Sequence, residues 1–344
     1  MSMTTIGHRT IDWQNFFAND SRQVFPVSAP QPFVPSSGWS GANFWKWPGE
    51  SENFLLKIWP AEGPEARQHL FRHSQLNNLR DLDLPLGLPV PDRTGRTLRP
   101  WSDGLWAEVI PWFGGSPATV SPEPAQVASV VQVLCELHQR WTETTASRTG
   151  PSSAVLNRLN QLKRIDLTRL LSSRADFLQK GLNLSAESME KLWEICRLAQ
   201  LLRDDAVSLL QPFENEKFRI LTILRDARPD QFLFHDGRLS GVIDFGAVGR
   251  DIIAVDLSRL ATEWFPEDLA QQDYFVRSYV KNRIVDEREF RLIRPLALSG
   301  AILGGLAWLD LHFRKGRSIG REEEFERAID HALSRLISFH QLRH

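Results

Sequence analysis

The sequence predicts an α+β protein of two lobes, in which a small lobe of antiparallel strands precedes a larger, mainly helical lobe. Three observations support this fold class. Strand-like aromatic and aliphatic runs dominate before residue 113, and helical apolar periodicity dominates from residue 121 onward. One further pair of strand-like runs interrupts the helical part near residue 235. At 344 residues, the chain is long enough to bury two separate cores.

The predicted lobe boundary lies at Gly114 and Gly115, which break the chain after the last strand of the first lobe. The N-terminal lobe is therefore residues 1–113, and the helical lobe is residues 114–344. Residues 1–30 belong to a lead-in rich in Pro and Ser, which predicts irregular structure with at most one short strand.

The elements of the first lobe follow from three runs. GANFWKW and NFLLKIW, joined by PGESE, predict an antiparallel hairpin over residues 41–59. Residues 65–82 read as a helix that follows Pro64 and carries apolar residues at positions 66, 70 and 76. After the loop LPLGLPVPDR, residues 97–115 predict two more strands around the turn Ser-Asp-Gly.

The second lobe is predicted to be helical with one embedded hairpin. Residues 121–141 begin with a Ser cap and a Pro at the first helical position, and apolar residues recur at 127, 130, 131, 134 and 137. QFLF and RLSGVIDF form the hairpin, with Asp236 and Gly237 in its turn. The remaining helices are expected within residues 154–218, where there are three, and at 266–281, 285–310 and 321–340.

Composition excludes several classes of function. Lys plus Arg total 41 and Asp plus Glu total 42, so the basic excess of a nucleic-acid binder is missing. Cys135 and Cys196 lie in helical stretches without metal-ligand spacing, and they make no disulfide framework. The N-terminus MSMTTIGHRTIDWQ has no apolar h-region of a signal peptide, and no segment reaches the roughly 18 consecutive apolar residues of a membrane span. We therefore expect a cytoplasmic protein, and the sequence does not indicate its oligomeric state.

A group of polar residues after the apolar run that ends near residue 224 suits phosphoryl transfer. This reaction needs a carboxylate for the attacking hydroxyl, a second carboxylate for Mg²⁺, and cations for the phosphate oxygens. Asp226 is the candidate base, and Arg228 is placed to neutralise charge on the transferred group. Asp244, at the end of an apolar strand, and Gln231 are the candidate metal ligands, and Gly246 is expected to allow a sharp turn beside the ion.

The first lobe offers residues for a nucleotide. Lys57, alone among the apolar residues of FLLKIW, is the candidate phosphate-binding cation, and Glu65 is the acid expected to steady it. SSGWSGANF has the composition of a loop whose backbone N–H groups approach phosphates. The loop residues predicted to contact the nucleotide are Ser37, Gly38, Ser40 and Gly41.

LRDARPDQ and IDFG resemble the catalytic loop and metal loop of the protein-kinase-like superfamily. They are most similar to the aminoglycoside phosphotransferase and choline kinase branch, which usually reads H-G-D-x-H-x-x-N and then I-D-[FW]-[GE]. The resemblance implies a two-lobed kinase-like fold, ATP and Mg²⁺ as cofactors, and a small-molecule hydroxyl as the acceptor. It also implies a catalytic role for Asp226, Mg²⁺ ligation by Asp244 and Gln231, and a nucleotide lysine at Lys57.

Two further roles follow from the resemblance alone. Glu108, Val109 and Ile110 match the hinge strand whose backbone usually meets the adenine, so Glu108 and Ile110 are predicted to bind the nucleotide. Asp256, in AVDLSRL, matches an Asp that commonly supports the catalytic loop from behind.

The chain departs from the family pattern at four positions of the catalytic loop. Leu224 replaces a structural His, Arg225 replaces Gly, Arg228 stands where His or Lys is frequent, and Gln231 replaces Asn. An alternative to an active enzyme is therefore a pseudokinase that binds nucleotide or has only a structural role. A further alternative is a structural protein that binds no nucleotide. His138 is expected to be a helix-face residue packed at the junction of the lobes.

Overall fold

The structure is a computed structural model. It describes residues 3–6, 9–12, 30–33, 42–48, 53–60, 66–92, 94–101, 104–118, 122–167, 171, 174–175, 184–283, 285–315, 318 and 321–342. The chain divides into two units, which are described separately below. The first unit comprises Met1–Ser116 and Leu233–Gly246, and the second comprises Pro117–Phe232 and Ala247–His344.

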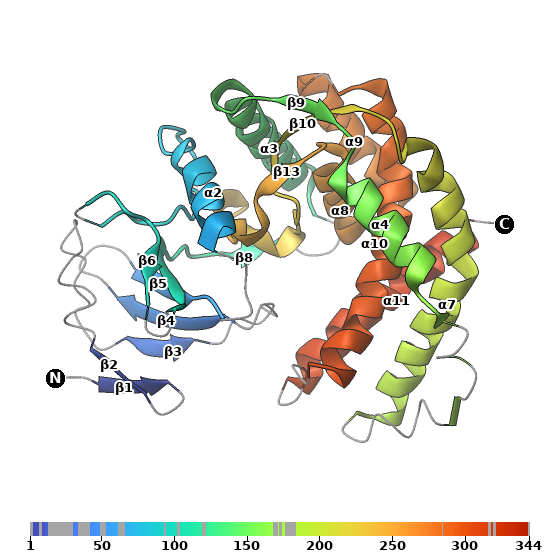
Figure 1. The fold of residues 1–344 in the computed structure, drawn as a ribbon, viewed down its shortest axis with the longest axis horizontal. Coiled ribbons are helices and arrows are strands. Elements are labelled where there is room, and N and C mark those ends of the chain that lie inside the picture. The colour runs from blue at the N-terminus through green and yellow to red at the C-terminus, as the bar shows by residue number, and fades with distance from the viewer. Residues whose placement is uncertain are drawn as a thin grey trace. The chain divides into compact units, whose positions relative to one another are not determined.

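The first unit contains a five-stranded antiparallel sheet in the order β3-β4-β5-β7-β6 (Figure 1). The predicted hairpin and the predicted pair of later strands are both confirmed. Helix α2 (Ala66–Asn77) follows the hairpin, also as predicted. The strands are β3 (Gln31–Phe33), β4 (Asn43–Pro48), β5 (Asn53–Ile58), β6 (Arg99–Pro100) and β7 (Trp106–Pro111).

Both faces of strand β5 are buried, and its successive side chains point to opposite faces with different surroundings. Phe54, Leu56 and Ile58 join an apolar core with residues of β4 and β7. Lys57 lies on the opposite face, where its buried side chain approaches polar residues of α2 and β7. The sheet therefore separates an apolar core from a buried polar cluster.

Two hairpins complete the first unit. Strands β1 (Met3–Ile6) and β2 (Arg9–Asp12) pair antiparallel, so the expectation of at most one strand in the lead-in is wrong. The predicted hairpin near residue 235 is confirmed as β11 (Phe232–His235) and β12 (Arg238–Val242), which form a small sheet with β8 (Ser116–Pro117). Its turn places Asp236 and Gly237 at positive φ, as a tight hairpin requires.

The second unit is mainly helical, and α10 packs against α4, α7, α8 and α11 (Figure 1). The largest fully buried side chains of this unit include Trp141, Trp264 and Tyr279. Most of residues 168–183 lie outside the described residues, so the third helix predicted before residue 218 is not tested. The helices are α3 (Pro124–Thr144), α4 (Ser153–Arg164), α7 (Ala186–Leu210), α8 (Ala254–Trp264), α9 (Leu269–Asn282), α10 (Glu287–Phe313) and α11 (Glu322–Gln341).

The N-cap of helix α3 lies two residues after the predicted Ser cap at position 121. Glu123 is the N-cap, with φ −65° and ψ 151°, and Pro124 occupies the first helical position. A residue before proline is pushed into extended geometry, so the helix cannot start earlier than Pro124. All five of the predicted apolar positions on this helix are buried.

A second, three-stranded sheet in this unit was not predicted. It has the order β13-β10-β9 and consists of β9 (Arg148–Gly150), β10 (Phe218–Ile223) and β13 (Gly249–Asp251). The short 3₁₀ segments are η2 (Gln211–Phe213), η3 (Pro229–Gln231) and η4 (Phe245–Ala247). Strand β10 leads directly into the predicted catalytic loop.

Among the described helices, α10 has the length and apolar composition of a membrane span. In the most apolar 18-residue window of this helix, 56% is buried inside the structure. Buried core helices of globular proteins share this composition.

Candidate active site

The backbone of the predicted catalytic loop is fixed by one buried carboxylate. Asp256, in the first turn of α8, accepts hydrogen bonds from the N–H groups of Leu224 at 2.8 Å and Arg225 at 2.7 Å. Arg225 adopts φ 66°, the left-handed conformation for which glycine is favoured, at the position where the resembled family has Gly. The support from Asp256 that the resemblance implied is present in the structure.

His138 reaches this carboxylate from α3. Its Nε2 lies 3.1 Å from Asp256 Oδ2, and its Nδ1 lies 2.8 Å from the hydroxyl of Tyr279. Burial raises the pKa of Tyr279 well above its ordinary value, so the hydroxyl keeps its proton and donates to Nδ1. The Nε2–H group then donates to Asp256. His138 is therefore more than a helix-face residue, because it binds Asp256, the carboxylate that supports the predicted catalytic loop.

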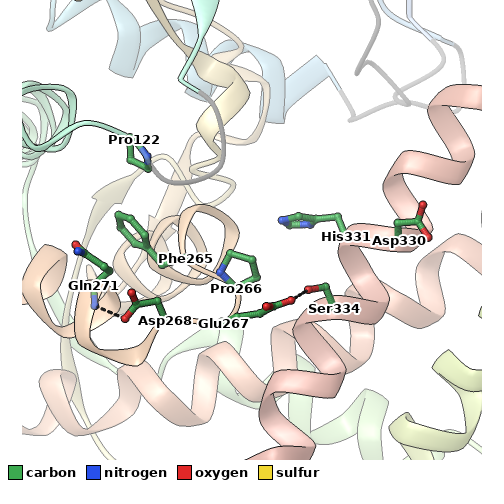
Figure 2. A pocket seen from close by; sticks show the side chains of 9 residues that line it. All are labelled: Pro122, Phe265, Pro266, Glu267, Asp268, Gln271, Asp330, His331 and Ser334. Carbon is green, nitrogen blue, oxygen red and sulfur yellow. Dashed lines mark hydrogen bonds between the residues drawn. The ribbon is translucent and has the colours of Figure 1, made fainter.

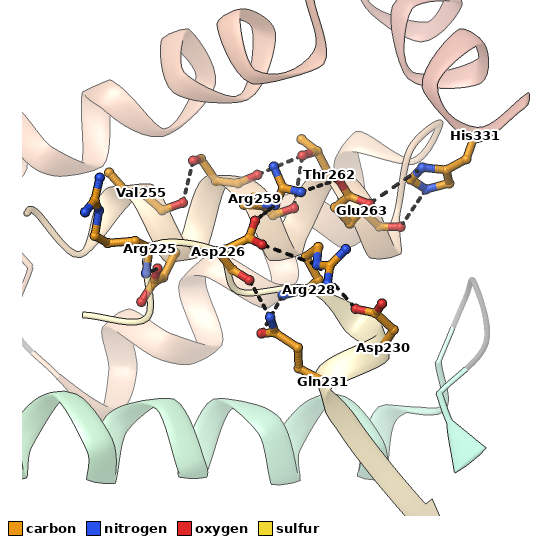
Figure 3. Close-up of polar contacts among 12 residues, drawn as sticks. Arg225, Asp226, Arg228, Asp230, Gln231, Val255, Arg259, Thr262, Glu263 and His331 are labelled. Atoms are coloured by element: carbon orange, nitrogen blue, oxygen red, sulfur yellow. Dashed lines mark hydrogen bonds and ion pairs between the residues drawn. The ribbon is translucent and has the colours of Figure 1, made fainter. Parts of the chain in front are cut away.

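The side chain of Asp226 lies among polar groups of the same unit (Figure 3). Its Oδ2 is 3.5 Å from Nε of Arg228, and its Oδ1 is 2.9 Å from Nε of Arg259. The Asp226 side chain is 39% exposed, so the carboxylate remains accessible. Sequence reasoning identified Asp226 and Arg228 but missed Arg259, which comes from α8.

Gln231 forms hydrogen bonds within the predicted catalytic loop. Its Nε2 donates to the carbonyl oxygen of Asp226 at 2.8 Å, and its Oε1 accepts the N–H of Arg228 at 3.2 Å. The buried amide therefore fixes the backbone on both sides of Asp226. An amide oxygen has two acceptor sites, so ligation of a hard cation is compatible with the bond from Arg228.

On the first unit, the predicted metal ligand meets the predicted nucleotide lysine. Lys57 Nζ donates to Asp244 Oδ1 at 3.2 Å, and Arg72 Nη1 donates to the carbonyl oxygen of Gly246 at 3.1 Å. Gly246 does not have positive φ. Glycine instead allows close packing there, because an added Cβ would lie 3.1 Å from the Trp59 ring and 3.0 Å from Asp244 Oδ1.

Glu108 is the buried acid of this region. Its Oε1 accepts the indole N–H of Trp59 at 3.1 Å, and its Oε2 lies 2.9 Å from Nε2 of His73 and 3.8 Å from Nη2 of Arg72. Burial alone would raise the pKa of Glu108, but His73 and Arg72 outweigh it and bring the value to about 2. Glu108 is therefore a structural anchor that faces Lys57 in strand register.

Helix α2 contributes bases to this cluster. His69 Nδ1 lies 2.6 Å from Arg72 Nη2, and burial together with the charge of Arg72 lowers the pKa of His69 to about 4. The neutral His69 therefore accepts a hydrogen bond from Arg72. The guanidinium of Arg72 lies 4.4 Å from the Trp59 ring centroid and the ammonium of Lys57 lies 3.9 Å from it, so both cations share one aromatic platform.

The backbone role predicted for Glu108 and Ile110 requires correction. Trp59 donates its N–H to the carbonyl oxygen of Trp106, and Trp112 donates its N–H to that of Asn53, so the even-numbered residues of β7 face β5. Backbone groups alternate along an antiparallel strand, so Glu108 and Ile110 also direct theirs into the sheet. Their backbone is therefore unavailable to an adenine.

Several predicted residues lie outside the described ones, namely Ser37, Gly38, Ser40, Gly41 and Glu65. Asp244 belongs to the first unit and Gln231 to the second. Within the described residues, no group of three or more His, Cys, Asp or Glu side chains is placed to hold a metal ion. The carboxylate of Asp244, 44% exposed, and the amide oxygen of Gln231 are the hard oxygen donors that Mg²⁺ prefers.

The second unit also has a pocket of about 500 Å³ between the α8–α9 connection and α11 (Figure 2). Its walls combine apolar groups with carboxylates, and His331 projects toward Phe265 and Pro266. Asp330 is paired with Lys191 at 2.7 Å. The lining residues are Pro122, Phe265, Pro266, Glu267, Asp268, Gln271, Asp330, His331 and Ser334.

The amino-acid sequence of this chain is similar to those of known proteins. Residues 34–293 match the model of the phosphotransferase enzyme family. A homoserine kinase of Granulibacter bethesdensis is 28% identical over 225 residues, which cover 56% of this chain and 67% of the relative.

Solved structures show the same fold. An amicoumacin kinase in complex with AMP-PNP and Ca²⁺ has a TM-score of 0.60 and 14% identity, over 92% of this chain and 93% of its own. The choline kinase of Cryptosporidium parvum Iowa II has a TM-score of 0.54 and 12% identity, over 94% of both chains. The fold is the predicted α+β protein-kinase-like fold. Because the family model covers more than half of the sequence, the chain belongs to the phosphotransferase enzyme family.

Proposed function

We propose that the protein is a small-molecule kinase that transfers the γ-phosphoryl group of ATP to a hydroxyl group and requires Mg²⁺. The observation that carries this proposal is the loop around Asp226. Its backbone is fixed from behind by Asp256 and from within by Gln231, while its carboxylate remains accessible. Such an arrangement suits a group that must orient an acceptor hydroxyl.

The names of similar proteins support the class of reaction. The relatives include a homoserine kinase, a choline kinase and an aminopropanol kinase, all named for small alcohols. Two similar solved structures contain AMP-PNP or ADP. These proteins support ATP as the phosphoryl donor and a small alcohol as the acceptor.

Each predicted residue has a physical role in the proposed reaction. Asp226 orients the acceptor hydroxyl and takes its proton as the new O–P bond forms, while the bond between the γ-phosphorus and the β–γ bridging oxygen breaks and ADP leaves. Arg228 reduces the negative charge on the transferred group. Lys57 binds phosphate oxygens of the nucleotide, and Asp244 with Gln231 would hold Mg²⁺. The metal ion, when bound, neutralises charge on the β- and γ-phosphates.

The nucleotide base needs a new contact because Glu108 and Ile110 face β5. Pro111 is the next odd-numbered residue of β7, and by the same alternation its carbonyl oxygen faces away from β5. We propose this carbonyl as an acceptor for the adenine amino group. To test this assignment, the Pro111 segment is altered and the selectivity for ATP over GTP is measured. We expect this selectivity to be lost.

The pocket in Figure 2 is the proposed acceptor site. It belongs to the same unit as Asp226, and its volume of about 500 Å³ falls in the range of small-molecule sites. Glu267, Asp268 and Asp330 make its lining acidic. An acceptor with an amino group is therefore favoured over one whose only charge is a carboxylate.

A panel of small alcohols tests the function. Homoserine, choline and 1-amino-2-propanol are incubated with ATP and Mg²⁺, and phosphorylated products are measured by mass spectrometry for the wild type and for Asp226→Asn. We expect a product that depends on ATP and Mg²⁺, and a loss of at least about 100-fold in the variant. A product formed equally well by Asp226→Asn would refute the role of Asp226.

One observation favours the pseudokinase alternative: the side chain of Gln231, the predicted metal ligand, is buried, and both ends of its amide form hydrogen bonds within the loop. Gln231→Asn separates the two functions. An increase in weak Mg²⁺-dependent activity indicates a compromised metal site. A decrease indicates that glutamine is the adapted ligand of an active enzyme.

A further inference from the structure

Asp226 is contacted by arginines from two different elements (Figure 3). Arg228 belongs to the loop itself, and its Nε lies 3.5 Å from Asp226 Oδ2. Arg259 belongs to α8, and its Nε lies 2.9 Å from Asp226 Oδ1. The closer cation therefore comes from outside the catalytic loop, on a helix that can hold it independently of the loop.

Helix α8 presents three charged residues to this region at helical spacing. Asp256, Arg259 and Glu263 stand at positions i, i+3 and i+7, so they share one face of the helix. Asp256 binds the loop backbone at Leu224 and Arg225, and Arg259 binds the loop side chain at Asp226. One rigid helix therefore determines both where the loop lies and where its carboxylate points.

Glu263 fixes Arg259 from the other side. Its Oε1 lies 3.8 Å from Arg259 Nη2 and accepts a hydrogen bond from Arg335 Nη1 at 2.6 Å. Arg335, on α11, is buried, and its Nη2 also donates to Thr262 Oγ1 at 3.2 Å. Burial alone would raise the pKa of Glu263, but Arg335 and Arg259 lower it to about 2, so this anchor stays ionised at neutral pH.

His331 links the same anchor to the proposed acceptor pocket. Its Nδ1 lies 3.6 Å from Glu263 Oε2, and its Nε2 lies 3.2 Å from the carbonyl oxygen of Glu263. The same side chain lines the pocket (Figure 2). A series of side-chain contacts therefore connects His331 at the pocket to Asp226, through Glu263 and Arg259.

We propose that Arg259 is a positioning residue that orients the carboxylate of Asp226 toward the acceptor, anchored by Glu263 on α8 and, through Glu263, by Arg335 on α11. This inference rests on the proposed function. The side chains of Arg259 and Asp226 are 28% and 39% exposed, and exposed ion pairs contribute little to folding stability. We therefore infer that the pair of Arg259 and Asp226 serves to orient the Asp226 carboxylate and contributes little to folding stability.

The pair of Glu263 and Arg335 is different because their side chains are only 15% and 7% exposed. Removing one partner of a buried ion pair destabilises a fold, so changes at Glu263 mix folding with catalysis. A substitution at Arg259 is expected to change catalysis without changing folding stability, so it separates the two effects.

The test compares Arg259→Gln and Arg259→Lys with the wild type, using the alcohol that gives a product in the panel. We expect kcat to fall by about 100-fold in Arg259→Gln, since a small misplacement of a catalytic group costs about that much. We expect a smaller loss in Arg259→Lys, which keeps the charge but loses the planar geometry of guanidinium. The KM for ATP and the thermal unfolding midpoint should stay at wild-type values.

Chemical rescue distinguishes positioning from general support of the fold. Added guanidinium should restore part of the kcat of Arg259→Ala, because it can occupy the vacated place beside Asp226. Arg277→Gln is the matched control, since Arg277 pairs with Asp273 on the exposed surface of α9. It should leave kcat unchanged.

The outcomes separate this inference from the proposed function. A wild-type kcat in Arg259→Gln overturns the inference and leaves the function intact. A loss of kcat with no rescue by guanidinium also overturns it. A wild type that phosphorylates no alcohol overturns the proposed function, and the inference with it.

Discussion

Replacement of Glu108 by Gln tests the buried cluster of the first unit. Glu108 is 5% exposed and lies against Trp59, His73 and Arg72. Glutamine keeps the shape of the side chain and one acceptor for the indole N–H of Trp59. It removes the negative charge that stabilises the imidazole of His73 and the guanidinium of Arg72.

The pKa of Glu108 sets the size of the effect. Its neighbours lower the value from 4.5 to about 2, and one pKa unit corresponds to about 1.36 kcal/mol, so the charged form is favoured by about 3 kcal/mol. A lowered carboxyl pKa stabilises the fold above its unfolded-state value, and this stability is lost as pH falls from about 4.5 toward 2. Glu108→Gln should therefore lose about 3 kcal/mol of stability at pH 7 and much less at pH 3.

The assay is hydrogen exchange of the β5 and β7 amides in urea, since it reports on the first unit alone. Glu143→Gln is the control, because Glu143 is exposed on α3 and bonds only to Gln139 among the interactions described. A loss below about 1 kcal/mol at pH 7, or a loss of equal size at pH 3, would refute the assignment of Glu108 as a charged anchor.

Three further changes test other parts of the structure. Burial raises the pKa of Glu289 from 4.5 to about 7, so the free energy of unfolding of the wild type should fall as pH rises from 5 to 8, by up to about 3 kcal/mol. Urea titrations of Glu289→Gln should no longer show this pH dependence. Gly115 has φ 113°, and an added Cβ would lie 2.5 Å from Ser240 Oγ, so Gly115→Ala should cost about 2 kcal/mol; unchanged thermal unfolding would contradict this. His138→Phe removes one of three hydrogen bonds to the buried carboxylate of Asp256 and keeps those from the Leu224 and Arg225 N–H groups, so it should cost about 2 kcal/mol, whereas a fully stable variant would mean that this bond is dispensable.

The main elements were predictable from the sequence pattern, and the spacing of the residues in the predicted catalytic and metal loops was enough to propose them as a site. Asp226 and Gln231 lie in one short loop, and Lys57 contacts Asp244, although 187 residues separate this last pair in sequence. The order of these residues along the chain was informative, because proteins of one fold family have the same strands, turns and loops in the same order. The support from Asp256 was predictable for the same reason.

The buried face of α2 was not predictable from apolar periodicity. Leu70, one of the apolar positions used to predict the helix, is 57% exposed, while His69, Arg72 and His73 are buried. Their burial depends on Glu108, which comes from a strand more than thirty residues later. Periodicity detects burial driven by hydrophobic contacts, and a buried ionic cluster has no such signature.

The missed sheet and the missed arginine have a common cause. Strands β9 and β13 each have three residues, too few for an alternating pattern, and both pair with β10 across long stretches of chain. No helix was predicted over the residues of α8, and Arg259, which lies on it, is found only once the loop is placed beside that helix. Its spacing from Asp256 and Glu263 was the one signal that pointed to a shared helix face.

Dependence on both ATP and Mg²⁺ is the central claim, and thermal unfolding of the wild type and Asp244→Ala tests it most directly. Each protein is unfolded with excess ATP, with and without Mg²⁺. A ligand at 100 times its dissociation constant adds about 2.7 kcal/mol of stability. We predict a Mg²⁺-dependent rise in the wild type that is lost in Asp244→Ala. An equal rise in both proteins, or no rise in the wild type, would contradict the proposed nucleotide and metal site.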